Sequence, residues 1–229
     1  MKIFLDSAHI DQIREVVSWG ILDGVTTNPS HVAATGANPK ELYPEICALV
    51  DGPVSLEAVS MDAEGIVEEA HELAAISDNV IVKIPLIKEG LIATKQLAAE
   101  GIRTNLTANY SAPQALLAAK AGATYVSPFV GRLDNSGVDG MILVEQIRKI
   151  FDNYSYSTEI IVAAVRNPMH VIRAGLCGAD ICTMNFEVLG MLLDHPLTDV
   201  TLEQFTNAWE NGPKQLLQAE SVGQPVETR

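Results

Sequence analysis

The chain has 229 residues, the usual size of one α/β barrel domain. Hydrophobic residues make up 48% and aromatic residues only 5%, so the core must be built from Ala, Val, Ile and Leu, which suits helices packed on a sheet. A formal net charge of −14 argues against nucleic acid and anionic membranes as partners, and an anionic substrate would need locally placed arginines.

The cysteines and the N-terminal segment indicate the compartment. Cys47, Cys177 and Cys182 are odd in number and lack C-x-x-C spacing, which favours free thiols in a reducing environment. The N-terminal residues read directly as a strand, without a signal-peptide pattern. No apolar run reaches the roughly 18 residues that a membrane-spanning helix needs. The sequence therefore predicts a cytoplasmic protein.

Eight β-prone segments alternate with segments whose apolar residues recur at helical spacing. The predicted strands cover residues 2–6, 24–30, 53–59, 80–85, 102–107, 124–130, 159–165 and 181–184. Helices are predicted around residues 10–17 and over 39–49, 62–76, 90–99, 112–121, 138–151, 169–176, 187–193 and 202–220. This alternation predicts a parallel sheet closed into a single (β/α)8 TIM barrel, with a C-terminal helical extension. An open, doubly wound sheet is the alternative.

The predicted fourth strand, VIVKIP, carries one lysine, Lys83, in an otherwise apolar run. Such a run is typical of a strand buried on both faces, where lysine is rare. Burial disfavours the ammonium form, which would lower the lysine pKa and leave a nucleophilic amine suited to Schiff-base chemistry on a carbonyl. The alternative is a structural lysine that pairs with a carboxylate or reaches solvent at the strand end.

Polar residues stand at or just after the ends of seven predicted strands. They are Asp6, Asn28, Glu57, Lys83, Asn105 with Thr107, Ser127 and Arg166. In a barrel the carboxyl ends of the strands share one rim, where active sites lie. Together these residues supply an amine nucleophile, two carboxylates for proton transfer and small polar groups for water and hydroxyls. We therefore predict an imine-forming lyase or transferase.

Five segments, FLDSA, GVTTNPS, VIVKIPL, ATYVSPFVGRLD and AAVRNP, resemble the transaldolases in their order and spacing. More narrowly they resemble the short group that includes the fructose-6-phosphate aldolases. The resemblance covers essentially the whole chain and implies one class I aldolase-type barrel over residues 1–229. Its lysine would attack the carbonyl of a ketose phosphate, fructose 6-phosphate or sedoheptulose 7-phosphate, and retro-aldol cleavage would leave a dihydroxyacetone enamine. A transaldolase of the pentose phosphate pathway passes that unit to an aldose phosphate, whereas an aldolase releases dihydroxyacetone.

The resemblance also assigns roles to residues. Lys83 matches the Schiff-base lysine, Glu57 the residue that acts through a water as acid and base, and Asp6 the carboxylate for the proton of C3–C4 cleavage. The positions matched to the catalytic water or to substrate are Thr107, Asn28, Thr26, Asn105, Ser127, Phe129, Arg132 and Arg166. Each arginine alone fits a surface ion pair, but two after adjacent strands fit a phosphate clamp better. Ala164 stands where the family usually has a serine, so one hydroxyl is missing.

Two positions bear on the choice between transferase and aldolase. In the family that the chain resembles, transaldolases carry Phe and Glu at two positions where fructose-6-phosphate aldolases carry Tyr and Gln. Phe129 and Glu57 therefore indicate a transaldolase. The alternatives are a fructose-6-phosphate aldolase, a non-covalent phosphosugar isomerase, and a phosphosugar-binding barrel that has lost catalysis.

The remaining patterns predict no cofactor. The five histidines show no H-E-x-x-H or clustered spacing, so no metal is expected, and the absence of G-x-G-x-x-G and P-loop motifs indicates no nucleotide cofactor. The expected ligands are small sugar phosphates. The terminal helix, within residues 199–221, is expected from the resemblance to pack on a neighbouring subunit of a homo-oligomer, a decamer of two pentamer rings.

Overall fold

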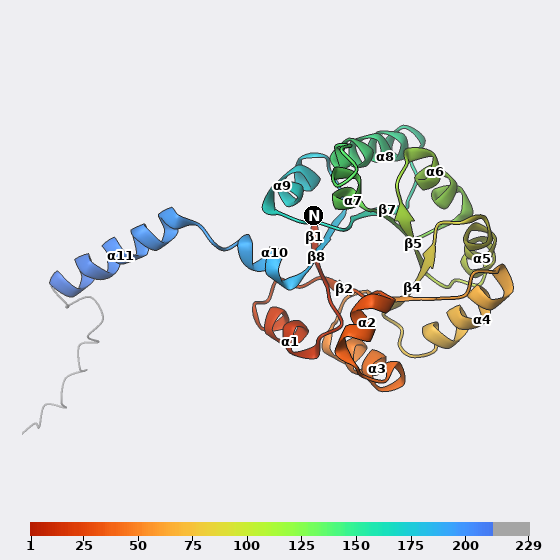
Figure 1. The fold of residues 1–229 in the computed structure, drawn as a ribbon, viewed down its shortest axis with the longest axis horizontal. Coiled ribbons are helices and arrows are strands. Elements are labelled where there is room, and N and C mark those ends of the chain that lie inside the picture. The colour runs from red at the N-terminus through yellow and green to blue at the C-terminus, as the bar shows by residue number, and fades with distance from the viewer. Residues whose placement is uncertain (213–229) are drawn as a thin grey trace, which may run out of the picture. The chain divides into compact units, whose positions relative to one another are not determined.

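A computed structural model describes residues 1–212, which contain eight parallel strands closed into one barrel (Figure 1). The strands are β1 Lys2–Asp6, β2 Gly24–Thr26, β3 Val54–Glu57, β4 Val80–Pro85, β5 Thr104–Asn109, β6 Tyr125–Pro128, β7 Glu159–Val162 and β8 Ile181–Met184. Each pairs with the next along the chain, and β8 pairs with β1. This closed order confirms the predicted (β/α)8 barrel and excludes the open doubly wound sheet, which has two unpaired edge strands.

Helices surround the barrel in Figure 1. They are α1 Ile10–Ser18, α2 Pro29–Thr35, α3 Pro39–Leu49, α4 Ala63–Ala74, α5 Lys88–Ala99, α6 Ala112–Ala121, α7 Val130–Asp134, α8 Gly140–Tyr154, α9 Pro168–Leu176 and α10 Phe186–Met191. Among the described residues no helix has the length and hydrophobicity needed to cross a membrane.

The sequence prediction missed two short helices, α2 and α7, because it extended the preceding strands through their starts. Helix α2 begins at Pro29, where the Oδ1 atom of Asn28 accepts a hydrogen bond of 3.0 Å from the backbone N–H of His31. Proline at the first helical position behind an asparagine cap is a favourable helix start. Helix α7 has only five residues, too few for a periodic pattern. The two helices place Asn28 and Arg132 beside strand ends.

Two strands also end differently from the prediction. Strand β7 stops at Val162 instead of residue 165, and Ala164 beyond it has a φ of 56°, in the left-handed region that a strand cannot contain. Strand β5 continues to Asn109, with a register shift between Leu106 and Asn109 and a φ of 59° at Ala108. An irregularity of this kind re-aims the neighbouring side chains at a barrel rim.

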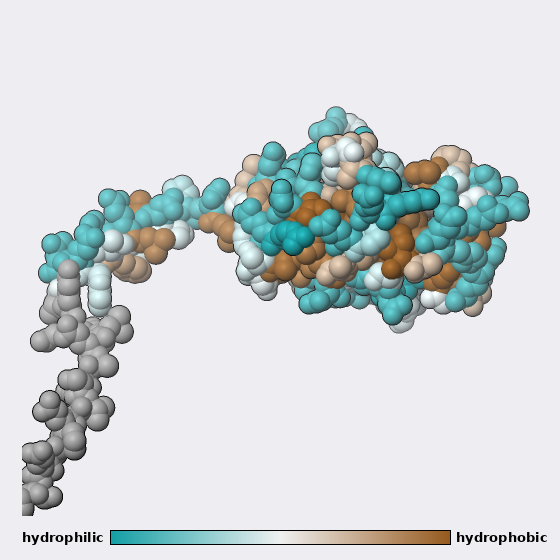
Figure 2. All heavy atoms as spheres, turned by 90° about the horizontal axis from the view of Figure 1, so that it is seen from below, coloured by the Kyte–Doolittle hydropathy of each residue, from teal (hydrophilic) through white to brown (hydrophobic). Residues whose placement is uncertain are grey.

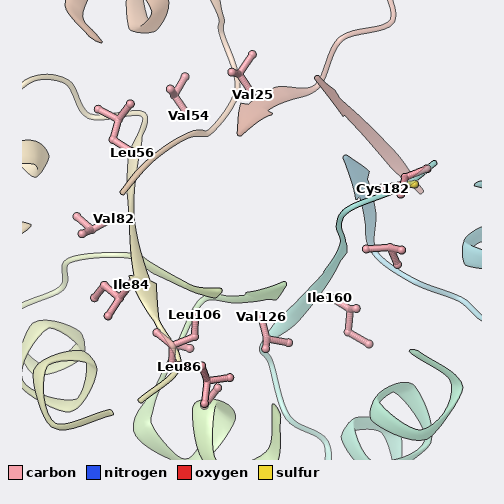
Figure 3. Packing of buried hydrophobic residues seen from close by; sticks show 14 of the residues in the cluster. Val25, Val54, Leu56, Val82, Ile84, Leu86, Leu106, Val126, Ile160 and Cys182 are labelled. Carbon is pink, nitrogen blue, oxygen red and sulfur yellow. The ribbon is translucent and has the colours of Figure 1, made fainter. Parts of the chain in front are cut away.

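The core follows the two-residue alternation of the strands. In β4, Val80, Val82 and Ile84 belong to the large hydrophobic cluster between sheet and helices, and Figure 3 shows Val82 and Ile84 pointing away from the barrel axis. Ile81 belongs instead to a separate buried cluster with Phe4, Tyr125, Ile161 and Ile181. Because alternate strand residues face opposite sides of the sheet, these five residues face the barrel interior and fill part of it. The same alternation turns Lys83 inward, above Ile81.

Residues 192–212, the last that the structure describes, belong to a second compact unit. Its helix, α11, spans Pro196–Asn211 and starts earlier than the predicted 202–220, because His195 caps it through Nδ1 and proline follows. Residues 213–221 of the predicted terminal helix lie outside the described residues. Figure 2 shows hydrophobic side chains along one side of α11. The exposed hydrophobic residues of this helix include Phe205 and Trp209. Its packing on a neighbouring subunit stays a prediction.

Candidate active site

A pocket of about 400 Å³ lies where the carboxyl ends of the strands meet. This volume falls within the roughly 300–1,000 Å³ of small-molecule sites. All the residues predicted for the site, except Asn105, line it: Asp6, Thr26, Asn28, Glu57, Lys83, Thr107, Ser127, Phe129, Arg132 and Arg166. They come from segments distributed over most of the chain, and the closed parallel register brings them together.

Lys83 is buried inside the pocket, with only 6% of its side chain exposed. Its Nζ atom lies 2.9 Å from Oε2 of Glu57 and donates a hydrogen bond of 3.0 Å to the backbone carbonyl of Thr27. Glu57 and Lys83 are register partners on β3 and β4, so the strand pairing itself sets their proximity. The lysine therefore pairs with a carboxylate, as the structural alternative expected, but this carboxylate also lines the pocket.

A second carboxylate, Asp6, stands at the end of β1, which β2 separates from the Glu57 strand, β3. Its Oδ1 atom accepts a hydrogen bond of 2.8 Å from the hydroxyl of Thr26, its register partner on β2. The Thr26 hydroxyl is also 2.7 Å from that of Thr183 on β8. Thr183 lines the pocket and was missed from the sequence, because the short strand ICTM reads as a core strand. This chain of hydroxyls fixes the orientation of the Asp6 carboxylate.

Asn105 and Thr107 stand two residues apart on β5 and differ in their surroundings. Asn105 is fully buried, donates to Ser55 over 3.3 Å and accepts from the hydroxyl of Ser127 over 2.7 Å, so it lies beneath the pocket and orients Ser127. Its predicted contact with substrate stays a prediction. Thr107 lines the pocket, and within residues 1–212 its buried hydroxyl has no hydrogen-bond partner. An unsatisfied buried hydroxyl costs about 1–3 kcal/mol, so this group favours a bound water or ligand.

Arg132, in α7, and Arg166, between β7 and α9, place two exposed guanidinium groups at the pocket rim. Arg148 and Arg173 pair with carboxylates elsewhere in the barrel. Within residues 1–212, by contrast, neither rim arginine makes an ion pair. In a chain of net charge −14, these two arginines concentrate positive charge at the pocket, which is suited to an anion.

One further pocket residue, His31, was considered from the sequence only as a possible metal ligand. Because Oδ1 of Asn28 accepts from the His31 backbone, the Asn28 amide NH2 faces the ring and donates to Nδ1 over 3.1 Å. The same ring nitrogen lies 3.6 Å from Oδ1 of Asp6. Both polar atoms of the Asn28 side-chain amide are therefore hydrogen-bonded to His31. Only the tertiary contact with Asp6 distinguishes His31 from an ordinary helix residue.

The possible metal-ligating side chains do not gather in the described part of the chain. Among residues 1–212 no group of three or more His, Cys, Asp or Glu side chains is arranged to hold a metal ion. The cysteines are free, and burial raises the pKa of the Cys182 thiol to about 12. The lysine amine, carboxylates and hydroxyls of the pocket are suited to nucleophilic attack and proton transfer.

Comparisons with known proteins identify the family of the chain. A sequence model of the family described as Transaldolase/Fructose-6-phosphate aldolase matches residues 3–224. A protein of Aquifex aeolicus named probable transaldolase is 58% identical over 214 residues, which cover 93% of this chain and 99% of that protein. Proteins of the same name from Dictyoglomus turgidum and Petrotoga mobilis are 56% and 58% identical, covering 93% and 92% of this chain and 100% and 95% of their own lengths. The chain belongs to the transaldolase/fructose-6-phosphate aldolase family.

Proposed function

We propose that the protein is a transaldolase, which transfers a dihydroxyacetone unit from a ketose phosphate to an aldose phosphate through a Schiff base on Lys83. The observation that carries the proposal is the buried Nζ atom of Lys83, inside a pocket and 2.9 Å from the Glu57 carboxylate. Names of close relatives support the same activity. Fructose 6-phosphate and sedoheptulose 7-phosphate are the proposed donors.

The first half of the reaction uses the Lys83–Glu57 pair. The ammonium must lose a proton before it can attack, and Glu57 is within reach to accept that proton. The amine then adds to the C2 carbonyl of the ketose. The resulting C2 hydroxyl is protonated by way of Glu57 and leaves as water, which gives the iminium ion. The unpartnered hydroxyl of Thr107 is suited to hold that water.

Cleavage of the C3–C4 bond follows. Asp6, oriented by Thr26, takes the proton of the C4 hydroxyl, the C4 carbonyl forms, and the electrons of the broken bond move into the iminium. The aldose phosphate leaves, and a dihydroxyacetone enamine stays on Lys83. Arg132 and Arg166 hold the phosphate group throughout, since guanidinium groups match phosphate oxygens in charge and geometry. Addition of the enamine to a new aldose phosphate, by the reverse steps, completes the transfer.

Phe129 favours a transferase over an aldolase. A tyrosine hydroxyl at this position could hold and protonate through the catalytic water, releasing free dihydroxyacetone, whereas a phenyl ring offers no such group. Formation of glyceraldehyde 3-phosphate from fructose 6-phosphate should therefore be fast only with erythrose 4-phosphate present. Phe129→Tyr should raise the release of free dihydroxyacetone. Equal rates with and without the acceptor would make the protein an aldolase.

The covalent step is tested by borohydride reduction in the presence of fructose 6-phosphate, followed by measurement of the intact protein mass. We expect a dihydroxyacetone adduct that peptide mapping assigns to Lys83 and that Lys83→Arg does not form. A non-covalent isomerase and a binding barrel both predict no adduct. If the wild-type protein gains no mass, or Lys83→Arg gains the same mass, the Schiff-base mechanism is wrong.

The family resemblance also supports a cytoplasmic enzyme of the pentose phosphate pathway that assembles as a decamer of two pentamer rings. The exposed apolar side chains of α11 are consistent with an interface in such an assembly. Analytical ultracentrifugation of the wild-type protein tests this assembly. A monomeric species at micromolar concentration would contradict it.

A further inference from the structure

The two rim arginines come from different segments of the chain, and one buried histidine joins these segments. His170, in α9, has 8% of its side chain exposed, and its Nε2 atom lies 2.6 Å from Oδ2 of Asp134 at the end of α7. Its Nδ1 atom accepts a hydrogen bond of 3.2 Å from the backbone N–H of Arg166. Arg132 lies in α7, so the ring contacts both arginine-bearing segments.

The hydrogen bonds determine the tautomer of the His170 ring. Nδ1 can accept from Arg166 only if it carries no hydrogen, so the hydrogen is on Nε2, which donates to Asp134. Both ring nitrogens are therefore used, one on each segment. Asp134 is fixed in turn, because its Oδ1 atom accepts from the backbone N–H of Gly140 over 2.9 Å. The chain of bonds thus connects the start of α8, the end of α7 and the backbone of Arg166.

The rest of the junction between the segments is tightly packed. The backbone N–H groups of Val130 and Gly131 donate to the carbonyls of Ala163 and Ala164 over 3.1 and 3.2 Å. A Cβ atom on Gly131 would lie 2.7 Å from Cγ of Arg166 and 2.2 Å from the Ala164 carbonyl oxygen. The stem of Arg166 therefore lies directly against the first turn of α7. The spacing of the two guanidinium groups depends on how these segments are held.

We propose that His170 is a positioning residue that sets the separation of Arg132 and Arg166 and thereby tunes recognition of the substrate phosphate. His170 does not line the pocket, so it acts through the two arginines. The inference rests on the proposed function, because the phosphate role of the arginines does. It goes further in assigning to the His170–Asp134 pair an effect on the phosphate group alone.

Two substitutions of His170 test the two hydrogen bonds of its ring separately. His170→Asn keeps an acceptor near the position of Nδ1 but is too short to reach Asp134, and His170→Gln can reach Asp134 but leaves the Arg166 N–H without its acceptor. Asp134→Asn leaves His170 in place; its oxygen is needed by Gly140, so its NH2 group meets the Nε2–H of the ring. The matched control is His71→Gln, because His71 pairs with Glu100 over 2.6 Å on the exposed side of α4, away from the pocket.

The experiment measures four quantities for each protein. They are KM and kcat for fructose 6-phosphate with D-glyceraldehyde as a phosphate-free acceptor, the inhibition constant of inorganic phosphate, and the rate of borohydride trapping with dihydroxyacetone. Loss of one hydrogen bond should raise KM and the inhibition constant by about tenfold. The kcat value and the trapping rate should stay within about twofold, because neither requires the phosphate contact. His71→Gln should match the wild type in all four.

The outcomes are distinguishable. If wild-type protein forms no adduct with dihydroxyacetone, the Schiff-base function itself fails. If the wild type is trapped but His170→Asn, His170→Gln and Asp134→Asn keep wild-type KM values and phosphate inhibition, the positioning role is overturned. It is equally overturned if trapping falls as much as phosphate affinity, because His170 then supports the whole barrel and not the phosphate site.

Discussion

The buried ion pair between Lys83 and Glu57 leads to a quantitative prediction about stability. Its charged atoms are 2.9 Å apart, which corresponds to about 6 kcal/mol of attraction at an effective dielectric constant of about 20. The cost of removing both charges from water offsets much of that attraction. The side chains differ in exposure, 6% for Lys83 and 18% for Glu57, so the ammonium depends more on its partner than the carboxylate does.

This asymmetry predicts unequal effects of the two single substitutions. Glu57→Gln leaves a buried ammonium whose charged acceptor is gone, with the Thr27 carbonyl remaining, and should lower the free energy of unfolding by about 3 kcal/mol. Lys83→Met removes the buried charge and keeps the apolar stem, while Glu57 still faces the pocket, so the loss should be about 1 kcal/mol or less. The double variant should be more stable than Glu57→Gln alone.

The assay is urea unfolding followed by circular dichroism, at one fixed protein concentration because subunit association would make apparent stability concentration-dependent. The two single variants and the double variant form a double-mutant cycle. If Glu57→Gln is as stable as the wild type, the Glu57 carboxylate does not stabilise the buried ammonium of Lys83. If the single effects add to the double effect within about 0.5 kcal/mol, the two groups are not coupled in solution.

Three further predictions concern catalysis and the thiols. Glu57→Gln should slow turnover by about 10²-fold or more while the imine stays trappable by borohydride, and unchanged turnover would assign proton transfer to another group. Ala164→Ser adds a hydroxyl at the pocket wall. One hydrogen bond contributes ~1 kcal/mol, so this variant should lower KM for fructose 6-phosphate by up to about tenfold. An equal effect on KM for unphosphorylated fructose would contradict a phosphate contact. Burial raises the pKa of Cys47 to about 11 and that of Cys182 to about 12. Iodoacetamide at pH 8 should therefore label the more exposed Cys177 first, as measured by peptide mapping. Labelling of Cys182 at a similar rate would mean that β8 opens.

The sequence by itself determined the barrel and most of the site. Strands and helices alternate, and this alternation leads to a parallel sheet whose carboxyl ends lie on one rim. The inward position of Lys83 also follows from local pattern, since every second residue of a buried strand faces the same side. Glu57 lies opposite Lys83 because the closed parallel register aligns β3 with β4. The proposed roles of these residues come from the family motifs.

Only the tertiary structure decided the features that depend on contacts between distant segments. Helix α7 has five residues and no side-chain N-cap, so its packing defines it, whereas α2 has a local Asn28–Pro29 start that the predicted strand over residues 24–30 concealed. Asn105 reads as a rim residue in the sequence, but the barrel places it beneath the pocket against Ser127. The contacts of His31 with Asp6 and of His170 with Asp134 follow no local rule, because the partners are brought together by neighbouring strands and helices. Hydrogen-bond partners of this kind are set by side-chain direction in three dimensions, which residue spacing along the chain does not contain.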